Sequence, residues 1–213
     1  MTIEKVTLQT INNRYSALSE SSCCLSCGGA IDYCDVKPGN TCLDLGSGRG
    51  NDVLRLADMT GTAGKVYGLD VSDGMLKKAR KNAEKFDVTN TEFIKSVLEE
   101  IPLDDESIDI IISNCTINHA EEKEKVWKEV YRVLKKDGYF VVSDIYSTEP
   151  VPKQYRSDPQ AIAECWAGAD TKEVYLQTLQ EAGFKAVEIL EQSTPYPKGE
   201  IEVASWTLKG VKK

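Results

Sequence analysis

The chain has 213 residues, a length that suits one domain with room for a small appendage. Hydrophobic residues make up 41% and charged residues 28%, ordinary values for a globular protein, and 26 Lys and Arg against 34 Asp and Glu give a net charge of −8. This charge argues against nucleic acid as a partner. No basic segment followed by an apolar stretch opens the chain and no apolar run reaches the length of a membrane span, so we expect a cytoplasmic protein without a membrane partner.

Strand and helix patterns alternate along the chain after an amino-terminal segment that contains one expected helix, at 11–18. Short apolar runs predict seven strands, at 41–45, 65–69, 92–94, 108–113, 138–145, 184–191 and 202–209. Apolar residues at helical spacing predict further helices at 50–58, 73–86, 121–136 and 171–182. Pro150, Pro152 and Pro159 mark a loop or insertion before the last of these helices. The pattern predicts an α/β fold with a doubly wound, mostly parallel, seven-stranded sheet and an antiparallel hairpin at one edge.

The end of the first expected strand carries the clearest ligand-binding motif. Asp44 is followed by three glycines at alternate positions, Gly46, Gly48 and Gly50, in a turn that opens a helix. A turn without Cβ atoms lets a ligand lie against the main chain, and the helix start offers unpaired N–H groups. The dinucleotide fingerprint G-x-G-x-x-G would need a glycine at 51, where this chain has Asn51.

Asp70 ends the next expected strand, twenty residues after Gly50, where an acid can accept both hydroxyls of a ribose. Together, the glycine turn and Asp70 resemble the first motifs of class I S-adenosylmethionine (SAM) dependent methyltransferases, whose fold is Rossmann-like. The alternative is a glycine-rich turn beside a surface carboxylate. The resemblance implies SAM as the cofactor, and the residues expected around it include Asp44, Gly46, Gly48, Gly50, Asn51, Asp70, Met75, Leu98, Glu99 and Asn114. Many members of the class carry Asp at the position of Val97, so here Glu99 or a backbone group would contact the adenine.

Seven cysteines are present, an odd number in a chain too long for a disulfide-stapled scaffold. In a reducing compartment, clustered thiols indicate binding of a soft ligand or redox chemistry. Cys42 lies inside the first expected strand and is expected in the core. Cys115 instead follows the strand at 108–113, in a loop expected to line the substrate site. Its alternative is an ordinary small buried thiol.

The segment Ile112-Ser113-Asn114-Cys115-Thr116-Ile117-Asn118 resembles a signature of the arsenite methyltransferases. The strand from Asp137 to Tyr146 resembles the one that follows in that family, and Glu164-Cys165-Trp166-Ala167-Gly168-Ala169 is similar to its second cysteine motif, with Ala167 in place of a glycine. Cys27-Gly28-Gly29 and the pair Cys23-Cys24 resemble its amino-terminal segment. The chain resembles a short form of the family, which leaves the number of methyl groups transferred open.

The resemblance implies transfer of a methyl group from SAM to trivalent arsenic held by Cys27, Cys115 and Cys165, in a detoxification reaction. Trivalent arsenic is soft and prefers thiolates, and its lone pair carries no proton, so no general base is needed. By the same resemblance Cys24 or Cys23 takes part in restoring the thiols with a reductant such as glutathione or thioredoxin, and Tyr15 lies near the cofactor sulfonium. We assign no catalytic role to His119, because its position is explained at least as well by capping of the helix that begins near 121.

Several alternatives stay open. Cys23, Cys24 and Cys27 could hold a structural zinc with Cys34 as the fourth ligand, and Tyr15 could simply pack a short helix on the core. The chain could methylate a small organic acceptor, or bind a metalloid through its thiols without turnover. We divide it into an amino-terminal, Cys-bearing segment at 1–38 that packs over the active site and a methyltransferase domain at 39–213. The oligomeric state is left open, a monomer included.

Overall fold

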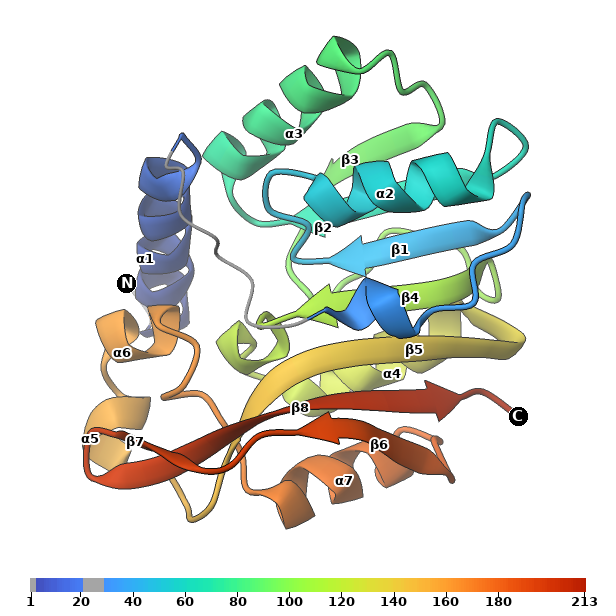
Figure 1. The fold of residues 1–213 in the computed structure, drawn as a ribbon. Helices are drawn as coiled ribbons and strands as arrows, with labels where there is room; N and C mark the ends of the chain where they lie inside the picture. The colour runs from blue at the N-terminus through green and yellow to red at the C-terminus, as the bar shows by residue number, and fades with distance from the viewer. Residues whose placement is uncertain (1–2, 21–28) are drawn as a thin grey trace.

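The computed structural model describes residues 3–20 and 29–213. Within these ranges, eight strands form one mixed sheet (Figure 1). Their order is β3-β2-β1-β4-β5-β8-β6, and β7 pairs with β8 off this path. The strands are β1 (Thr41–Leu45), β2 (Lys65–Asp70), β3 (Thr91–Lys95), β4 (Ile108–Asn114), β5 (Leu134–Ser147), β6 (Val187–Gln192), β7 (Tyr196–Lys198) and β8 (Ile201–Val211).

The strands from β3 to β5 run parallel, and β8 pairs antiparallel with β5, β6 and β7. The predicted doubly wound sheet with an antiparallel edge is therefore confirmed. The sequence predicts seven strands, whereas the described residues form eight, because the link between the last two predicted strands contains β7. Pro197 is tolerated there because β7 lies off the main path of the sheet, where a missing N–H interrupts no second ladder.

Seven α-helices and two short 3₁₀ helices occur among the described residues. They are α1 (Ile3–Leu18), η1 (Ala30–Tyr33), α2 (Asn51–Thr60), α3 (Asp73–Lys85), η2 (Ile117–His119), α4 (Lys123–Val133), α5 (Lys153–Arg156), α6 (Pro159–Ala163) and α7 (Lys172–Glu181). The region expected to be a loop around the three prolines contains α5 and α6. Asp158 caps α6 by accepting from the backbone N–H of Gln160, and Pro159 occupies the first turn, where its missing N–H costs nothing.

Two helices differ in extent from the prediction. Helix α1 begins at Ile3 instead of residue 11 and packs against α3 and α6, so tertiary contacts stabilise a segment with a weak local signal. Helix α4 ends at Val133 instead of residue 136, and β5 begins at Leu134, which pairs with Ile108 of β4. A register shift between Ile108 and Ile110 lets β5 continue past this irregular start.

Apolar residues cover both faces of the sheet, as expected for a parallel arrangement. On one face, Leu43 and Leu45 of β1 lie in a cluster with Trp127 of α4 and Tyr175 of α7. On the other, Cys42 is fully buried with residues of α2 and η1, which confirms its predicted place in the core. This two-sided packing sets the carboxyl ends of β1, β2 and β4 at one edge of the molecule.

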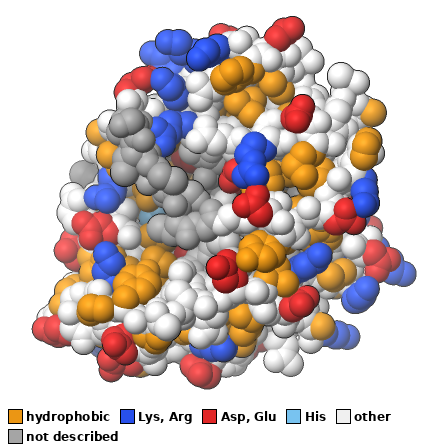
Figure 2. All heavy atoms as spheres, viewed as in Figure 1, with side chains coloured by type: hydrophobic (Ala, Val, Ile, Leu, Met, Phe, Trp, Pro, Cys, Tyr) orange, Lys and Arg blue, Asp and Glu red, His pale blue; other side chains and the backbone are white. Residues whose placement is uncertain are grey.

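On the face drawn in Figure 2, described acidic and basic side chains are interspersed among apolar ones. The described side chains of that face form no continuous basic patch of the kind that binds a nucleic acid backbone. Among the helices of residues 3–20 and 29–213, none has the length and apolar character that crossing a membrane requires.

Candidate active site

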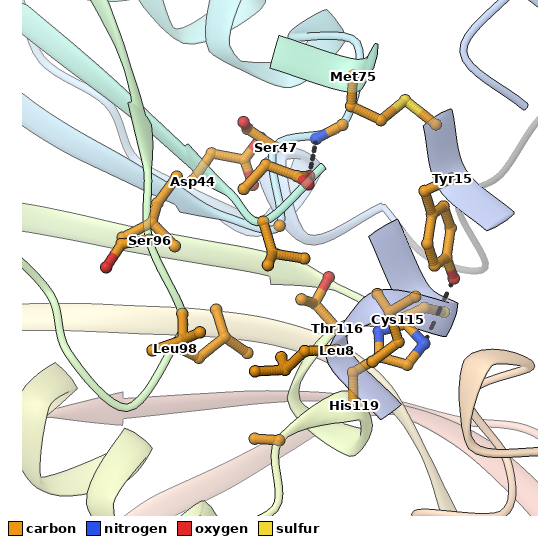
Figure 3. Close-up of a pocket in the computed structure, with 18 of the residues that line it drawn as sticks. Leu8, Tyr15, Asp44, Ser47, Met75, Ser96, Leu98, Cys115, Thr116 and His119 are labelled. Atoms are coloured by element: carbon orange, nitrogen blue, oxygen red, sulfur yellow. Dashed lines mark hydrogen bonds between the residues drawn. The ribbon is translucent and has the colours of Figure 1, made fainter. Parts of the chain in front are cut away.

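A cavity of about 350 Å³ opens at the carboxyl ends of β1, β2 and β4, beneath helix α1 (Figure 3). This is the point where strand order reverses, since β1 lies between β2 and β4, and ligands of such sheets bind there. The expected site residues that line the cavity are Tyr15, Asp44, Gly46, Gly48, Asn51, Asp70, Met75, Leu98, Glu99, Asn114 and Cys115. Gly50 and Cys165 are not among the lining residues, and Cys24 and Cys27 lie outside the described residues.

The glycine turn forms one wall of the cavity. The N–H groups of Gly46 and Ser47 both donate to the carbonyl oxygen of Leu69, at 2.8 and 2.9 Å, which ties the turn to β2. Gly46 has a φ of +72°, and a Cβ there would lie 2.1 Å from the hydroxyl of Thr116, so only glycine lets the loop after β4 approach so closely. Gly50 begins α2 with a φ of +78° and packs near Phe93 instead of facing the cavity.

Asp70 is held by the backbone on both sides. Its Oδ2 accepts from the N–H of Gly48 at 2.8 Å and its Oδ1 from the N–H of Ser72 at 2.8 Å. Burial raises its pKa, and the hydrogen bonds from the backbone partly offset that rise. The carboxyl group is therefore oriented at the cavity wall before any ligand arrives.

The interior of the cavity suits a positively charged ligand. Burial raises the pKa of Asp44 well above its usual range, and the charges of Asp52 and Asp70 raise it further. A cation between these carboxyl groups would relieve their repulsion. The hydroxyl of Ser47 also lines the cavity, is buried, and has no hydrogen-bond partner among the described residues. A cationic ligand with polar groups, such as SAM, fits these carboxyl groups and the Ser47 hydroxyl.

The loop after β3 forms the side of the cavity where an adenine is expected. Leu98 is 8% exposed and offers an apolar surface. Glu99 lines the cavity, but its Oε1 accepts from the N–H groups of Glu121 and Glu122 at 3.1 and 3.4 Å, at the start of α4. Its contact with an adenine stays a prediction.

Asn114 forms hydrogen bonds with two segments that are far from it in the sequence. Its Oδ1 accepts from the N–H of Ala30 at 3.2 Å, and its Nδ2 donates to Asp52 of α2 at 3.1 Å. Arg55 of α2 also forms an ion pair with Asp32 at 2.6 Å. Residues 30–32, in the later part of the amino-terminal segment, are thus held beside the end of β4, adjacent to Cys115.

Cys115 and Cys165 meet although fifty residues separate them in the sequence. The Sγ of Cys165 lies 3.1 Å from the carbonyl oxygen of Cys115, and the two residues are 5% and 7% exposed respectively. Both have a left-handed backbone, with φ of +53° at Cys115 and +76° at Cys165. A residue with a Cβ is strained in that conformation, which is uncommon outside glycine. A requirement for thiols at these two positions would explain why glycine does not occupy them.

Close packing joins the loops that carry the two cysteines. A Cβ at Gly168 would lie 1.9 Å from the carbonyl oxygen of Asn118, so glycine alone permits this contact. Lys123 donates to the carbonyl oxygen of Gly168 and pairs with Asp170 at 2.7 Å, which fastens the Cys165 loop to the start of α4.

Sequence reasoning missed Asp144, whose carboxyl group lies next to the thiol of Cys165. Asp144 is 1% exposed, and its Oδ1 accepts from Asn118 and from the N–H of Ile145, with the Cys165 thiol 3.7 Å away. Burial raises its pKa to about 6. A buried acid in an otherwise apolar strand, at 138–145, was the available signal.

The prediction that His119 caps the next helix is wrong. Helix α4 begins at Lys123 with Glu122 before it, and no side chain caps that end. His119 instead lies in η2 and faces Tyr15, with Nε2 3.3 Å from the phenol oxygen. Three residues separate η2 from α4, so His119 does not lie at the start of α4. Its side chain lines the cavity instead.

Among residues 3–20 and 29–213, no group of three His, Cys, Asp or Glu side chains could hold a metal ion. The suggested zinc ligands Cys23, Cys24 and Cys27 lie outside these ranges, so that alternative stays a prediction. Burial raises the pKa of the fourth suggested ligand, Cys34, to about 12, and its thiol donates to the carbonyl oxygen of Ala30.

The parallel sheet, the glycine turn and the acid after β2 define the fold of class I SAM-dependent methyltransferases. The chain belongs to the methyltransferase domain family, whose model matches residues 36–183. An arsenite methyltransferase of Halobacterium salinarum is 41% identical over 174 residues, which are 81% of this chain and 44% of that protein. The chain thus spans less than half the length of this curated relative.

Two further similarities are informative. The crystal structure of an arsenic(III) SAM methyltransferase from Chlamydomonas reinhardtii superposes with a TM-score of 0.74 and 27% identity, covering 100% of this chain and 74% of that one. A ubiquinone/menaquinone biosynthesis C-methyltransferase of Salmonella arizonae is 34% identical over 128 residues, which are 59% of this chain and 51% of that protein. The similarity therefore includes methyltransferases with different acceptors.

Proposed function

We propose that this protein transfers a methyl group from SAM to trivalent arsenic bound by cysteine thiols. The observation that carries the proposal is the contact of Cys165 with Cys115, which lines the cavity, each residue having a left-handed backbone. The names of the Halobacterium and Chlamydomonas relatives support the same acceptor.

We assign the cofactor roles to residues that line the cavity. Asp70 would accept the ribose hydroxyls, the turn from Gly46 to Gly48 would lie along the cofactor, and Leu98 would pack on the adenine. When bound, SAM supplies an electrophilic methyl group on a positively charged sulfur. The buried carboxyl group of Asp44 and the half-buried one of Asp52 would favour that charge.

Three thiolates would hold the substrate, because trivalent arsenic prefers soft sulfur ligands. Cys115 and Cys165 supply two of them, and we assign the third to Cys27, which lies outside the described residues. Cys27 is three residues before Ala30, whose N–H bonds to Asn114, and three extended residues span at most about 11 Å. Cys27 therefore has the reach to join the other two thiols.

The protein's part in the reaction is mainly positioning. The arsenic lone pair carries no proton, so methyl transfer needs no general base, and holding acceptor and donor together lowers the barrier. We assign the residues 1–38 to a segment that covers this site, since α1 lines the cavity with Leu8, Ile11 and Tyr15.

Attack by the arsenic lone pair forms the As–C bond and breaks the S–CH₃ bond, so S-adenosylhomocysteine leaves and arsenic is formally oxidised by two electrons. Two protein thiols would return these electrons and become a disulfide, which glutathione or thioredoxin would reduce through Cys24 or Cys23. We place the reaction in the cytoplasm.

The test is a methyl-transfer assay with SAM, arsenite and excess thiol, in which arsenic species are separated by chromatography and detected by mass. The variants Cys115→Ser and Cys165→Ser should form no methylated arsenic. The matched control is Cys34→Ser, which removes a half-buried thiol away from the cavity and should retain activity. Absence of methylated arsenic, from parent protein that binds SAM, would reject the proposal.

A second candidate is methylation of a small organic acceptor, which the similarity to the Salmonella C-methyltransferase favours. An organic acceptor makes no use of paired thiols. Activity on such a compound that survives in both cysteine variants would therefore support this candidate over arsenite.

A further inference from the structure

Tyr15 of α1 and His119 of η2 join parts of the chain that are 104 residues apart. The phenol oxygen lies 3.3 Å from Nε2 of the imidazole, and the two rings meet edge to face with centroids 5.5 Å apart. Figure 3 shows the two side chains pointing toward one another. Both residues line the cavity, as does Cys115.

The direction of this hydrogen bond follows from the surroundings of the ring. The imidazole also hydrogen-bonds the backbone of Ala163, and burial lowers its pKa to about 4, so the ring is neutral at neutral pH. Because Nε2 faces Tyr15, we assign the N–H donated to the Ala163 carbonyl to Nδ1. Nε2 then carries a lone pair and accepts the proton of the phenol, which burial keeps protonated by raising the pKa of Tyr15.

The contact fastens one side of helix α1. On its other side, Ser16 accepts from the N–H of Gly74 at 3.1 Å and bonds the hydroxyl of Ser72 at 3.0 Å, next to Asp70. Helix α1 is thereby attached at both the Asp70 end and the Cys115 end of the cavity. Leu8 and Ile11, which precede these attachments in the same helix, also line the cavity.

We propose that His119 is a positioning residue for methyl transfer, because its hydrogen bond holds the Tyr15 ring, and with it helix α1, across the Cys115 end of the cavity. The proposal rests on the proposed function only in requiring a bound SAM, and holds for any acceptor. With its proton directed at His119, the phenol keeps its oxygen lone pairs and ring face for the ligand, and both attract a positively charged group.

The test compares His119→Phe, Tyr15→Phe and the double variant with the parent. His119→Phe keeps a ring and removes the acceptor, while His119→Gln retains an acceptor and serves as the conservative variant. The matched control is Tyr139→Phe, which removes a phenol that accepts from the N–H of Asp35 away from the cavity. The first readout is amide hydrogen exchange of α1 in the full-length protein, and the second is calorimetric binding of S-adenosylhomocysteine, which cannot donate a methyl group.

Loss of one hydrogen bond of about 1 kcal/mol should weaken S-adenosylhomocysteine binding and speed exchange in α1 about fivefold in each single variant. The double variant should be no weaker than either single one, since all three lack the same bond. His119→Gln should restore most of the parent behaviour, and Tyr139→Phe should leave both readouts unchanged. Parent-like α1 exchange in Tyr15→Phe, or additive losses in the double variant, would overturn the proposal. Neither readout depends on arsenite, so failure of the proposed acceptor would leave this test intact.

Discussion

The thiol of Cys165 lies 3.1 Å from the carbonyl oxygen of Cys115, and both residues have a backbone conformation that usually belongs to glycine. Two segments far apart in the sequence therefore converge at the cost of local strain.

The first prediction concerns the strain at Cys165. Because its φ is +76°, Cys165→Gly should be more stable than Cys165→Ala by about 1 kcal/mol, the reverse of the usual order. Urea unfolding of the two variants measures the difference, and both should lack methyl transfer to arsenite. Equal stability, or a more stable Ala variant, would show that the backbone at 165 is not strained.

The second prediction concerns the contact between the two cysteine loops. In Gly168→Ala the new Cβ would lie 1.9 Å from the carbonyl oxygen of Asn118, so the Cys165 loop must shift. Stability should fall by about 2 kcal/mol and arsenite methylation should be lost, while SAM binding measured by calorimetry is retained, because the glycine turn is untouched.

The control for this variant is Gly61→Ala. Gly61 also has a positive φ, of +65°, but nothing lies within 4 Å of the added Cβ. Because its ψ is −177°, a backbone conformation found almost only at glycine, the variant should lose about 1 to 3 kcal/mol of stability through strain and leave methylation unchanged. Full arsenite methylation by Gly168→Ala would contradict the role of the loop contact.

The third prediction concerns Asp70. Asp70→Asn replaces one of two acceptor oxygens with an NH₂ group, which faces the donor N–H of either Gly48 or Ser72. SAM binding should weaken about 10- to 100-fold, the range expected for loss of a hydrogen bond to a charged group. Asp73→Asn is the control, since that exposed carboxylate pairs with Lys95 and lies outside the cavity lining. Unchanged SAM affinity in Asp70→Asn would place the ribose elsewhere.

The fourth prediction concerns pH and uses the fact that His119 is the one histidine of the sequence. Burial lowers its pKa from 6.5 to about 4, so the unfolded chain binds a proton before the folded one does as the pH falls. The stability that His119 contributes is full above about pH 6.5 and is lost progressively toward pH 4, by at most about 3 kcal/mol.

The measurement is the free energy of unfolding in urea between pH 7.5 and 5, for the parent and His119→Gln. The parent should lose more stability than the variant over this range. Asp144, whose pKa is raised to about 6, contributes with the opposite sign but is present in both proteins and cancels in the difference. Parallel pH curves would mean that the histidine is not held neutral in the fold.

Local patterns in the sequence predicted the elements that build the cofactor side of the site. The apolar run before Asp44, the glycines at alternate positions and the acid twenty residues later identify a strand, a turn and a second strand end. Each of these signals spans a few residues, because strand burial and turn geometry depend on neighbours in the chain. The same local reasoning missed residues 3–10 of α1, a helix that packs as a whole against α3 and α6.

The sequence by itself determined the alternation of strands and helices, the glycine turn, and the presence of thiols after one strand and in a later loop. Tertiary structure alone decided that Cys115 meets Cys165, that Asp144 lies next to Cys165 and that His119 faces Tyr15. The partners in these pairs are 21 to 104 residues apart. No periodic pattern records a contact at such separations, because it depends on how the whole sheet brings its strand ends together.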